Sequence, residues 1–134
     1  MEAGELSVEF EGAEPQELLE WAFERFAVDG RRLACTGFSN GASYTLSLGL
    51  TNGDLFSHLV AFSPGFMAPA ELAGRPPIFI AHGTEDRALP IEKTSRRFVP
   101  RLRGEGYSVT YREFEGKHEI SPRLSREALD WFLA

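Results

Sequence analysis

A serine, an aspartate and a histidine that could act together chemically follow one another along the chain, each just past an apolar run. Ser39 is the centre of a Gly-x-Ser-x-Gly motif, Asp86 ends a His-Gly-Thr-Glu-Asp segment, and His118 ends a Gly-Lys-His segment. A serine hydroxyl is a poor nucleophile near neutral pH, and it needs a base within hydrogen-bond reach whose other nitrogen is held by a carboxylate. These three residue types could therefore carry out nucleophilic attack on an acyl group.

The surroundings of the serine motif predict a strand, a sharp turn and a helix. An apolar, partly β-branched run occupies residues 33–36, and a helix-compatible stretch occupies residues 42–50. At the tip of such a turn the serine is held in a strained backbone conformation, and the flanking glycines avoid collisions with the strand and the helix. The backbone N–H of Asn40 would lie at the positive end of the helix dipole, beside a developing oxyanion.

The other two residues also follow predicted strands. Asp86 comes after the apolar run at residues 77–81, and His118 comes after a strand-like run at residues 108–114. In a parallel sheet the carboxyl ends of the strands lie along one edge, so three residues that are distant in sequence can converge there. Gly-x-Ser-x-Gly alone is a weak pattern, and the order of the three residues strengthens it.

Four motifs together resemble the C-terminal half of an α/β-hydrolase, and most closely the phospholipase/carboxylesterase and dienelactone-hydrolase-like branch. They are Gly-Phe-Ser-Asn-Gly at 37–41, Ala-Phe-Ser-Pro-Gly at 61–65, Ile-Ala-His-Gly at 80–83 with Asp86 and Pro90, and Gly-Lys-His at 116–118. By this resemblance Ser39 is the nucleophile, His118 is the general base and acid, and Asp86 orients the histidine. The backbone N–H of Asn40 is then the first oxyanion donor.

The resemblance covers roughly residues 15–134, and the chain departs from the family at its front. A full member begins with about four more strands, and a loop after one of them supplies the second oxyanion N–H. Nothing in residues 1–14 resembles that loop. A dimer partner or the loop at residues 63–66 could supply a substitute.

The resemblance implies a serine hydrolase that cleaves small soluble carboxylic esters through an acyl-enzyme intermediate, without a metal or an organic cofactor. Phe66 and Met67 are candidates for the substrate pocket, although packing onto the domain is an equal alternative. Two other hypotheses stay open. One is a non-catalytic hydrolase-fold remnant or interaction module, and the other is half of a split or truncated enzyme.

The remaining histidines and acids receive structural or solvated assignments. His58 opens an apolar strand and is interpreted as structural, and His82 is expected to brace the acid loop. The carboxylates of Glu85, Glu115 and Glu119 are expected to be solvated.

Composition indicates one soluble domain. The chain has 134 residues, of which 43% are hydrophobic and 25% charged, and its net charge is −6. Eight glutamates and no basic residue occur up to Glu24, which argues against nucleic acid as a partner. No apolar run is long enough for a membrane span, so a cytoplasmic location is expected. The single cysteine, Cys35, offers neither a disulfide nor a metal-binding pair and is interpreted as a buried filler.

The predicted fold class is α/β, a truncated α/β-hydrolase fold with about four mainly parallel strands flanked by helices. A possible extra strand lies at residues 5–10 within an acidic N-terminal segment, 1–14, of a single domain. Helices are predicted from Pro15 to about Phe26, from Pro90 towards Arg103, and after Ser121. The alternation of strands with helices is typical of a parallel sheet that is covered on both faces.

The strand before the serine motif would normally have another strand on its outer side. An uncovered apolar edge is an aggregation hazard, so something is expected to cover it. The candidates are the segment at residues 6–10, a second copy of the chain, or a missing part of a longer protein. A homodimer is the favoured expectation, with exchange of N-terminal segments as one route to it.

Overall fold

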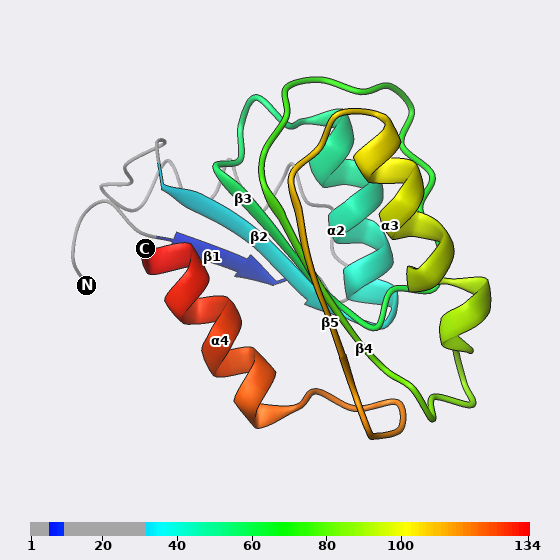
Figure 1. Ribbon diagram of the computed structural model, residues 1–134. Coiled ribbons are helices and arrows are strands. Elements are labelled where there is room, and N and C mark those ends of the chain that lie inside the picture. The colour runs from blue at the N-terminus through cyan, green and yellow to red at the C-terminus, as the bar shows by residue number, and fades with distance from the viewer. Residues whose placement is uncertain (1–5, 10–31) are drawn as a thin grey trace.

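A computed structural model describes residues 6–9 and 32–134, and these form one parallel sheet with helices on both faces (Figure 1). The sheet has the strand order β1-β2-β3-β4-β5, with every neighbouring pair parallel. The strands are β1 (Leu6–Glu9), β2 (Leu33–Phe38), β3 (His58–Phe62), β4 (Ile78–Gly83) and β5 (Val109–Phe114). The described helices are α2 (Asn40–Thr51), a short 3₁₀ helix η1 (Ile91–Lys93), α3 (Ser95–Gly104) and α4 (Pro122–Leu133). The predicted α/β fold with mainly parallel strands is confirmed, while the helix predicted from Pro15 lies outside the described residues.

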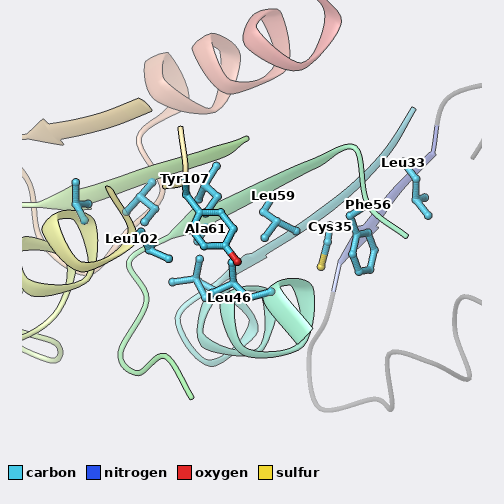
Figure 2. Close-up of a cluster of buried hydrophobic side chains, with 13 residues drawn as sticks. Leu33, Cys35, Leu46, Phe56, Leu59, Ala61, Leu102 and Tyr107 are labelled. Atoms are coloured by element: carbon cyan, nitrogen blue, oxygen red, sulfur yellow. The ribbon is translucent and has the colours of Figure 1, made fainter. Parts of the chain in front are cut away.

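Helices α2 and α3 cover one face of the sheet, and every second residue of the inner strands points into the layer between the sheet and these helices (Figures 1 and 2). The three inner strands β2, β3 and β4 read as nearly continuous apolar runs because both of their faces are buried. The buried cluster on this face consists of Leu33, Cys35, Ala42, Leu46, Leu50, Phe56, Leu59, Ala61, Ile78, Ile80, Val99, Leu102 and Tyr107. Cys35 is the buried filler that the sequence predicted, and burial raises the pKa of its thiol to about 12.

Helix α4 packs on the opposite face, against the strand residues in the alternate register (Figure 1). The cluster there consists of Val60, Phe62, Phe79, Ala81, Leu124 and Ala128, with Trp131 packed against it. Ser121 caps α4 by accepting a hydrogen bond from the N–H of Leu124 at 3.3 Å, and Pro122 occupies the first turn. This start of the helix agrees with the sequence prediction.

Strand β1 lies along the outer edge of β2. Leu6 is opposite Leu33 and Glu9 is opposite Thr36, so a segment of the same chain covers the first four residues of β2. Of the three candidates for this edge, the structure therefore shows the chain's own N-terminal segment. The homodimer was predicted in order to cover this edge, and that reason no longer applies. The homodimer itself stays a prediction.

The connection after β4 differs from the single helix predicted from Pro90. Thr94 adopts φ −126° and ψ −103°, which separates η1 from α3. Its hydroxyl donates to the carbonyl of Pro90 at 2.9 Å, and its N–H donates to the carbonyl of Ile91 at 3.3 Å. A threonine hydroxyl that competes for nearby backbone groups in this way interrupts a helix.

Ser63, which directly follows β3, combines two features that are expected to lower the stability of the fold. It has a positive φ of 53° and is fully buried, and its hydroxyl has no hydrogen-bond partner among the described residues. A glycine accepts this backbone conformation without steric cost, and an unsatisfied buried hydroxyl is unfavourable. We expect Ser63→Gly to raise the free energy of unfolding by about 1 kcal/mol in urea denaturation.

Ser63→Ala is the matched control, because it removes the hydroxyl and keeps the strained backbone. A smaller gain for alanine than for glycine supports the backbone contribution. A Ser63→Gly protein that is less stable than the wild type contradicts the prediction.

Candidate active site

Ser39 occupies a sharp turn between β2, which ends at Phe38, and α2, which begins at Asn40. Its backbone has φ 59° and ψ −118°, a combination that a non-glycine residue adopts only when the surroundings impose it. The N–H of Ser39 donates to the carbonyl of Phe62 at 2.9 Å, and its own carbonyl accepts from the N–H of Ser43 at 3.0 Å. The neighbouring strand and the helix therefore hold the strained turn from both sides.

Gly37 allows the strand and the helix to meet at this turn. A Cβ atom on Gly37 would lie 2.3 Å from both the carbonyl carbon and the carbonyl oxygen of Gly41. Backbone atoms cannot move aside without disturbing the turn, so only glycine fits at this position. This is the steric reason for the spacing of glycines that the sequence indicated.

Ser39, His118 and Asp86 form one hydrogen-bonded series. The hydroxyl of Ser39 lies 2.9 Å from Nε2 of His118, and Nδ1 of His118 lies 2.7 Å from Oδ2 of Asp86. A carboxylate accepts only, so Nδ1 carries the proton and Nε2 is free to accept from the serine. The predicted convergence of the three side chains at the carboxyl edge of the sheet is thus observed.

Asp86 is buried and yet placed to carry a negative charge. Burial by itself raises the pKa of its carboxyl group, but the hydrogen bonds from the N–H of Leu89, at 2.7 Å to Oδ1, and from His118 outweigh it and lower the pKa below its usual value. The ionised form is therefore the stable one, and it fixes the tautomer of His118.

The loops that carry Asp86 and His118 are tied together through their backbones. The N–H of Glu85 donates to the carbonyl of Gly116 at 2.9 Å, and a Cβ on Gly83 would lie 2.4 Å from the carbonyl oxygens of Gly116 and Lys117. The ring of Phe38 lies 4.8 Å from the ring of His118, centroid to centroid. Sequence reasoning missed Phe38 because it fills a variable position of the serine motif.

His82 is buried directly beneath Asp86. Its Nδ1 lies 2.7 Å from the hydroxyl of Ser95, and its Nε2 lies 2.8 Å from the carbonyl of Leu89 and 3.2 Å from Oδ2 of Asp86. It braces the acid loop as the sequence indicated. The sequence placed Thr94 or Ser95 on the inward face of the predicted helix, but it did not indicate a contact between Ser95 and this histidine.

His58 has a structural environment, in agreement with its sequence interpretation. Its ring lies edge-on to Trp131 and Phe132 at 5.0 and 4.9 Å between centroids, and its Nδ1 lies 2.8 Å from the hydroxyl of Ser57. Burial, with a smaller contribution from the charge of Arg32, lowers the pKa of His58. The three acids predicted to be solvated, Glu85, Glu115 and Glu119, are exposed.

The backbone N–H groups of residues 63–66, considered from sequence as a source of the second oxyanion donor, are already engaged. The N–H of Ser63 donates to the carbonyl of Ala81 at 2.8 Å, and those of Gly65 and Phe66 donate to the hydroxyl of Ser43 at 2.8 and 3.0 Å. Residue 64 is a proline and has no N–H. That expectation is therefore wrong for this arrangement, whereas Asn40 lies at the N-terminus of α2, where N–H groups lack helical acceptors.

The loop after β3 follows α2 through regularly spaced hydroxyls. Besides Ser43, the hydroxyl of Ser47 accepts from the N–H of Ala68 at 2.9 Å, and that of Thr51 accepts from the N–H of Ala70 at 3.1 Å. Four helical residues rise about 6 Å, and two residues of extended chain span about 6.6 Å, so the two periods match. We call residues 65–70 the strap.

Phe66 and Met67 lie on the strap and differ in surroundings. Phe66 is 43% exposed, and its ring meets the ring of Tyr44 edge-on at 5.8 Å between centroids. Met67 packs against the buried cluster beneath α2 and α3 and lines a cavity of about 230 Å³ together with Leu50 and Tyr107. For Met67 the structure thus shows packing onto the domain, the alternative that the sequence left open.

Within residues 6–9 and 32–134, no group of three or more His, Cys, Asp or Glu side chains is arranged to hold a metal ion. Among the helices described, none is long and apolar enough to cross a bilayer.

Comparison with known proteins points to one family. The family model for phospholipase/carboxylesterase matches residues 12–133. Among solved structures, esterase PE8 has 25% sequence identity and a TM-score of 0.78, and the match covers 87% of this chain and 56% of that protein. No curated protein sequence matches significantly.

Two further structures share the fold at lower identity. The carboxylesterase of Bacillus cereus has 22% identity and a TM-score of 0.72, with 87% of this chain and 56% of that one covered. The S-formylglutathione hydrolase of Staphylococcus aureus has 17% identity and a TM-score of 0.74, with 89% and 59% covered. The chain thus spans little more than half the length of these three structures.

Replacement of Gly37 tests the steric requirement of the turn. Because the new Cβ of Gly37→Ala would collide with the backbone of Gly41, we expect the free energy of unfolding to fall by about 3 kcal/mol. The control is Gly104→Ala, since a Cβ on Gly104 meets nothing within 4 Å. Urea denaturation measures both, and equal effects of the two substitutions would refute the steric argument.

Two histidines that are withdrawn from water, His82 fully and His58 in part, allow a prediction of how stability depends on pH. Burial lowers the pKa of His58 and of His82 below the ordinary value of 6.5, so below about pH 6.5 the unfolded chain binds protons that the folded chain does not. Their contribution to stability is therefore present above that pH and is lost as the pH falls. We expect the urea midpoint to decrease from pH 7 to pH 5, and less steeply in His82→Gln. A midpoint that stays constant over this range is the contrary result.

Proposed function

Because the chain belongs to the phospholipase/carboxylesterase family, we propose that it is a serine hydrolase that cleaves small carboxylic esters through an acyl-enzyme intermediate. Membership of the family and the likeness to esterases support ester hydrolysis in general. The observation that carries the finer proposal is the hydrogen-bonded series from Ser39 through His118 to Asp86. Its donors and acceptors run in the direction that activation of a serine requires.

In the first half of the reaction, Oγ of Ser39 attacks the carbonyl carbon of the ester while Nε2 of His118 accepts the hydroxyl proton. The tetrahedral intermediate carries its negative charge on the former carbonyl oxygen. When it collapses, the bond to the alkoxy group breaks, and His118 gives its proton to the departing alcohol. Ser39 is left as an ester of the acyl group.

In the second half, water replaces the alcohol. The oxygen of the water attacks the acyl carbon while His118 accepts a proton from that water. His118 then gives the proton to Oγ of Ser39 as the bond between the acyl carbon and Oγ breaks. The products are a carboxylic acid and the free serine. Neither half consumes an oxidant, a reductant or a metal-bound group.

Asp86 and Asn40 stabilise the charges that appear on this route. Asp86 remains ionised and offsets the positive charge of His118 each time the imidazole is protonated, at 2.7 Å. The N–H of Asn40, at the start of α2, donates to the oxyanion, where the dipole of the helix also favours negative charge. Loss of one such donor typically lowers turnover about a hundredfold or more.

The proposed substrate is a small ester with an apolar portion. Phe66 and Tyr44 form an exposed aromatic pair on the strap and on α2, and they offer an apolar contact to the alkyl part of the substrate. Met67, next to Phe66 on the strap, packs against the core and so anchors the strap beside this aromatic pair.

A second candidate is an enzyme that is complete only with a further polypeptide, either a complementing segment or a second copy of the chain. Two observations favour it. The chain spans 56% of the length of esterase PE8, and the N–H groups of residues 63–66 are engaged within the chain or, at Pro64, lacking. The second oxyanion donor would then come from the added polypeptide, and sedimentation of the active species would show its stoichiometry.

Replacement of Ser39 tests the proposed function. The purified protein should hydrolyse p-nitrophenyl acetate and butyrate, and Ser39→Ala should lower kcat about a thousandfold or more, because the nucleophile is removed. A fluorophosphonate should add its mass to the peptide that contains Ser39. The matched control is Ser108→Ala, since Ser108 is exposed and lies before β5, at the other end of the sheet. A folded wild type without turnover or label would refute the function for this chain alone.

A further inference from the structure

Two histidines share one carboxylate oxygen at the candidate site. Oδ2 of Asp86 lies 2.7 Å from Nδ1 of His118 and 3.2 Å from Nε2 of His82. Serine activation by the proposed route uses only His118. His82 is fully buried and cannot touch a substrate, so its contact with Asp86 needs a separate explanation.

The partners of His82 fix the position of its proton. The carbonyl of Leu89 lies 2.8 Å from Nε2 and can only accept, so Nε2 carries a hydrogen. The carboxylate of Asp86 is also an acceptor on this side. Nδ1 faces the hydroxyl of Ser95 at 2.7 Å, which can donate to its lone pair. The neutral Nε2–H tautomer gives the carbonyl of Leu89 its donor, places the N–H side of the ring next to Oδ2 and lets Nδ1 accept from Ser95. The opposite tautomer would set a lone pair against two acceptors.

The neutral state of His82 matters for the charge of Asp86. Burial lowers the pKa of His82, so the ring stays uncharged while its Nε2 lies 3.2 Å from Oδ2. A charged imidazolium at this distance would offset much of the carboxylate's charge. A neutral ring contacts the oxygen and leaves that charge available to His118, which becomes positive during the reaction.

His82 also completes the geometric restraint on the carboxylate. The N–H of Leu89 holds Oδ1 at 2.7 Å, so Oδ1 is fixed from the acid loop. Without His82, the only side chain within the described residues that contacts Oδ2 would be His118, the ring that the carboxylate has to orient. Ser95, fully buried at the start of α3, anchors His82 in turn. The restraint therefore extends from α3 through two histidines to Ser39.

We propose that His82 is a positioning residue of the hydrolase, which, held in its Nε2–H tautomer by Ser95, fixes Oδ2 of Asp86 so that His118 presents Nε2 to Ser39. The proposal rests on the function proposed above. Because His118 takes part in the chemical steps and not in substrate binding, we expect His82 to affect kcat and to leave KM nearly unchanged.

The test compares His82→Gln with His82→Met, two side chains of similar length and shape. The amide nitrogen of glutamine can donate where Nε2 does, and methionine cannot. With p-nitrophenyl butyrate as substrate, we expect His82→Met to lower kcat roughly tenfold to a hundredfold with little change in KM, because small displacements of catalytic groups have effects of this size. His82→Gln should restore most of kcat.

Both variants are assayed at a temperature where circular dichroism shows them fully folded. If His82→Met does not fold, Ser95→Ala against Ser95→Thr provides the same comparison one contact further away, with a loss of kcat expected for alanine only. Equal kcat values for the two members of the pair that folds, in an active protein, would overturn the role of His82. A wild type that neither turns over nor labels Ser39 would instead refute the proposed function.

A measurement without substrate tests the tautomer itself. Proton–nitrogen correlation spectra of the imidazole rings at pH 7 should show His82 neutral, with its proton on Nε2. A proton on Nδ1, or on both nitrogens, would overturn the inference whether or not the protein is active.

Discussion

A buried negative charge is the constraint on which this site depends. Asp86 has its side chain fully withdrawn from water, and such a group is tolerated only when hydrogen-bond donors replace the lost solvent. The donors come from the acid loop itself and from the loop after β5, and His82 at the end of β4 contacts the same carboxylate. Satisfying one carboxylate thus fixes the loop after β5 against the end of β4 and the acid loop.

The sheet makes this convergence possible. Because all five strands are parallel, the segments after β2, β4 and β5 begin at the same edge. The apolar strand residues bury both faces, and the tight approaches at Gly37 and Gly83 let loop backbones meet where side chains would collide. The polar chemistry is therefore confined to one edge of an otherwise apolar layer.

Much of this could be predicted from sequence, because it follows local rules. The turn at Ser39, the cap at Ser121 and the order of the three site residues come from turn chemistry, capping and strand periodicity. The break at Thr94 and the engagement of the N–H groups near Gly65 could not be predicted in the same way. They depend on which acceptor a donor finds in three dimensions, and the sequence around Ser43 or Ser95 does not show which group the hydroxyl will meet.

The strap restricts the changes in sequence that residues 65–70 can accept. Surface loops usually tolerate insertions and deletions. Here, however, the N–H groups of residues 66, 68 and 70 donate in turn to the hydroxyls of Ser43, Ser47 and Thr51, which lie about one helical turn apart on α2. One added residue would turn every later N–H away from its hydroxyl. A change in length is therefore expected to disturb the strap, whereas replacement of an exposed side chain such as Phe66 leaves these backbone hydrogen bonds in place.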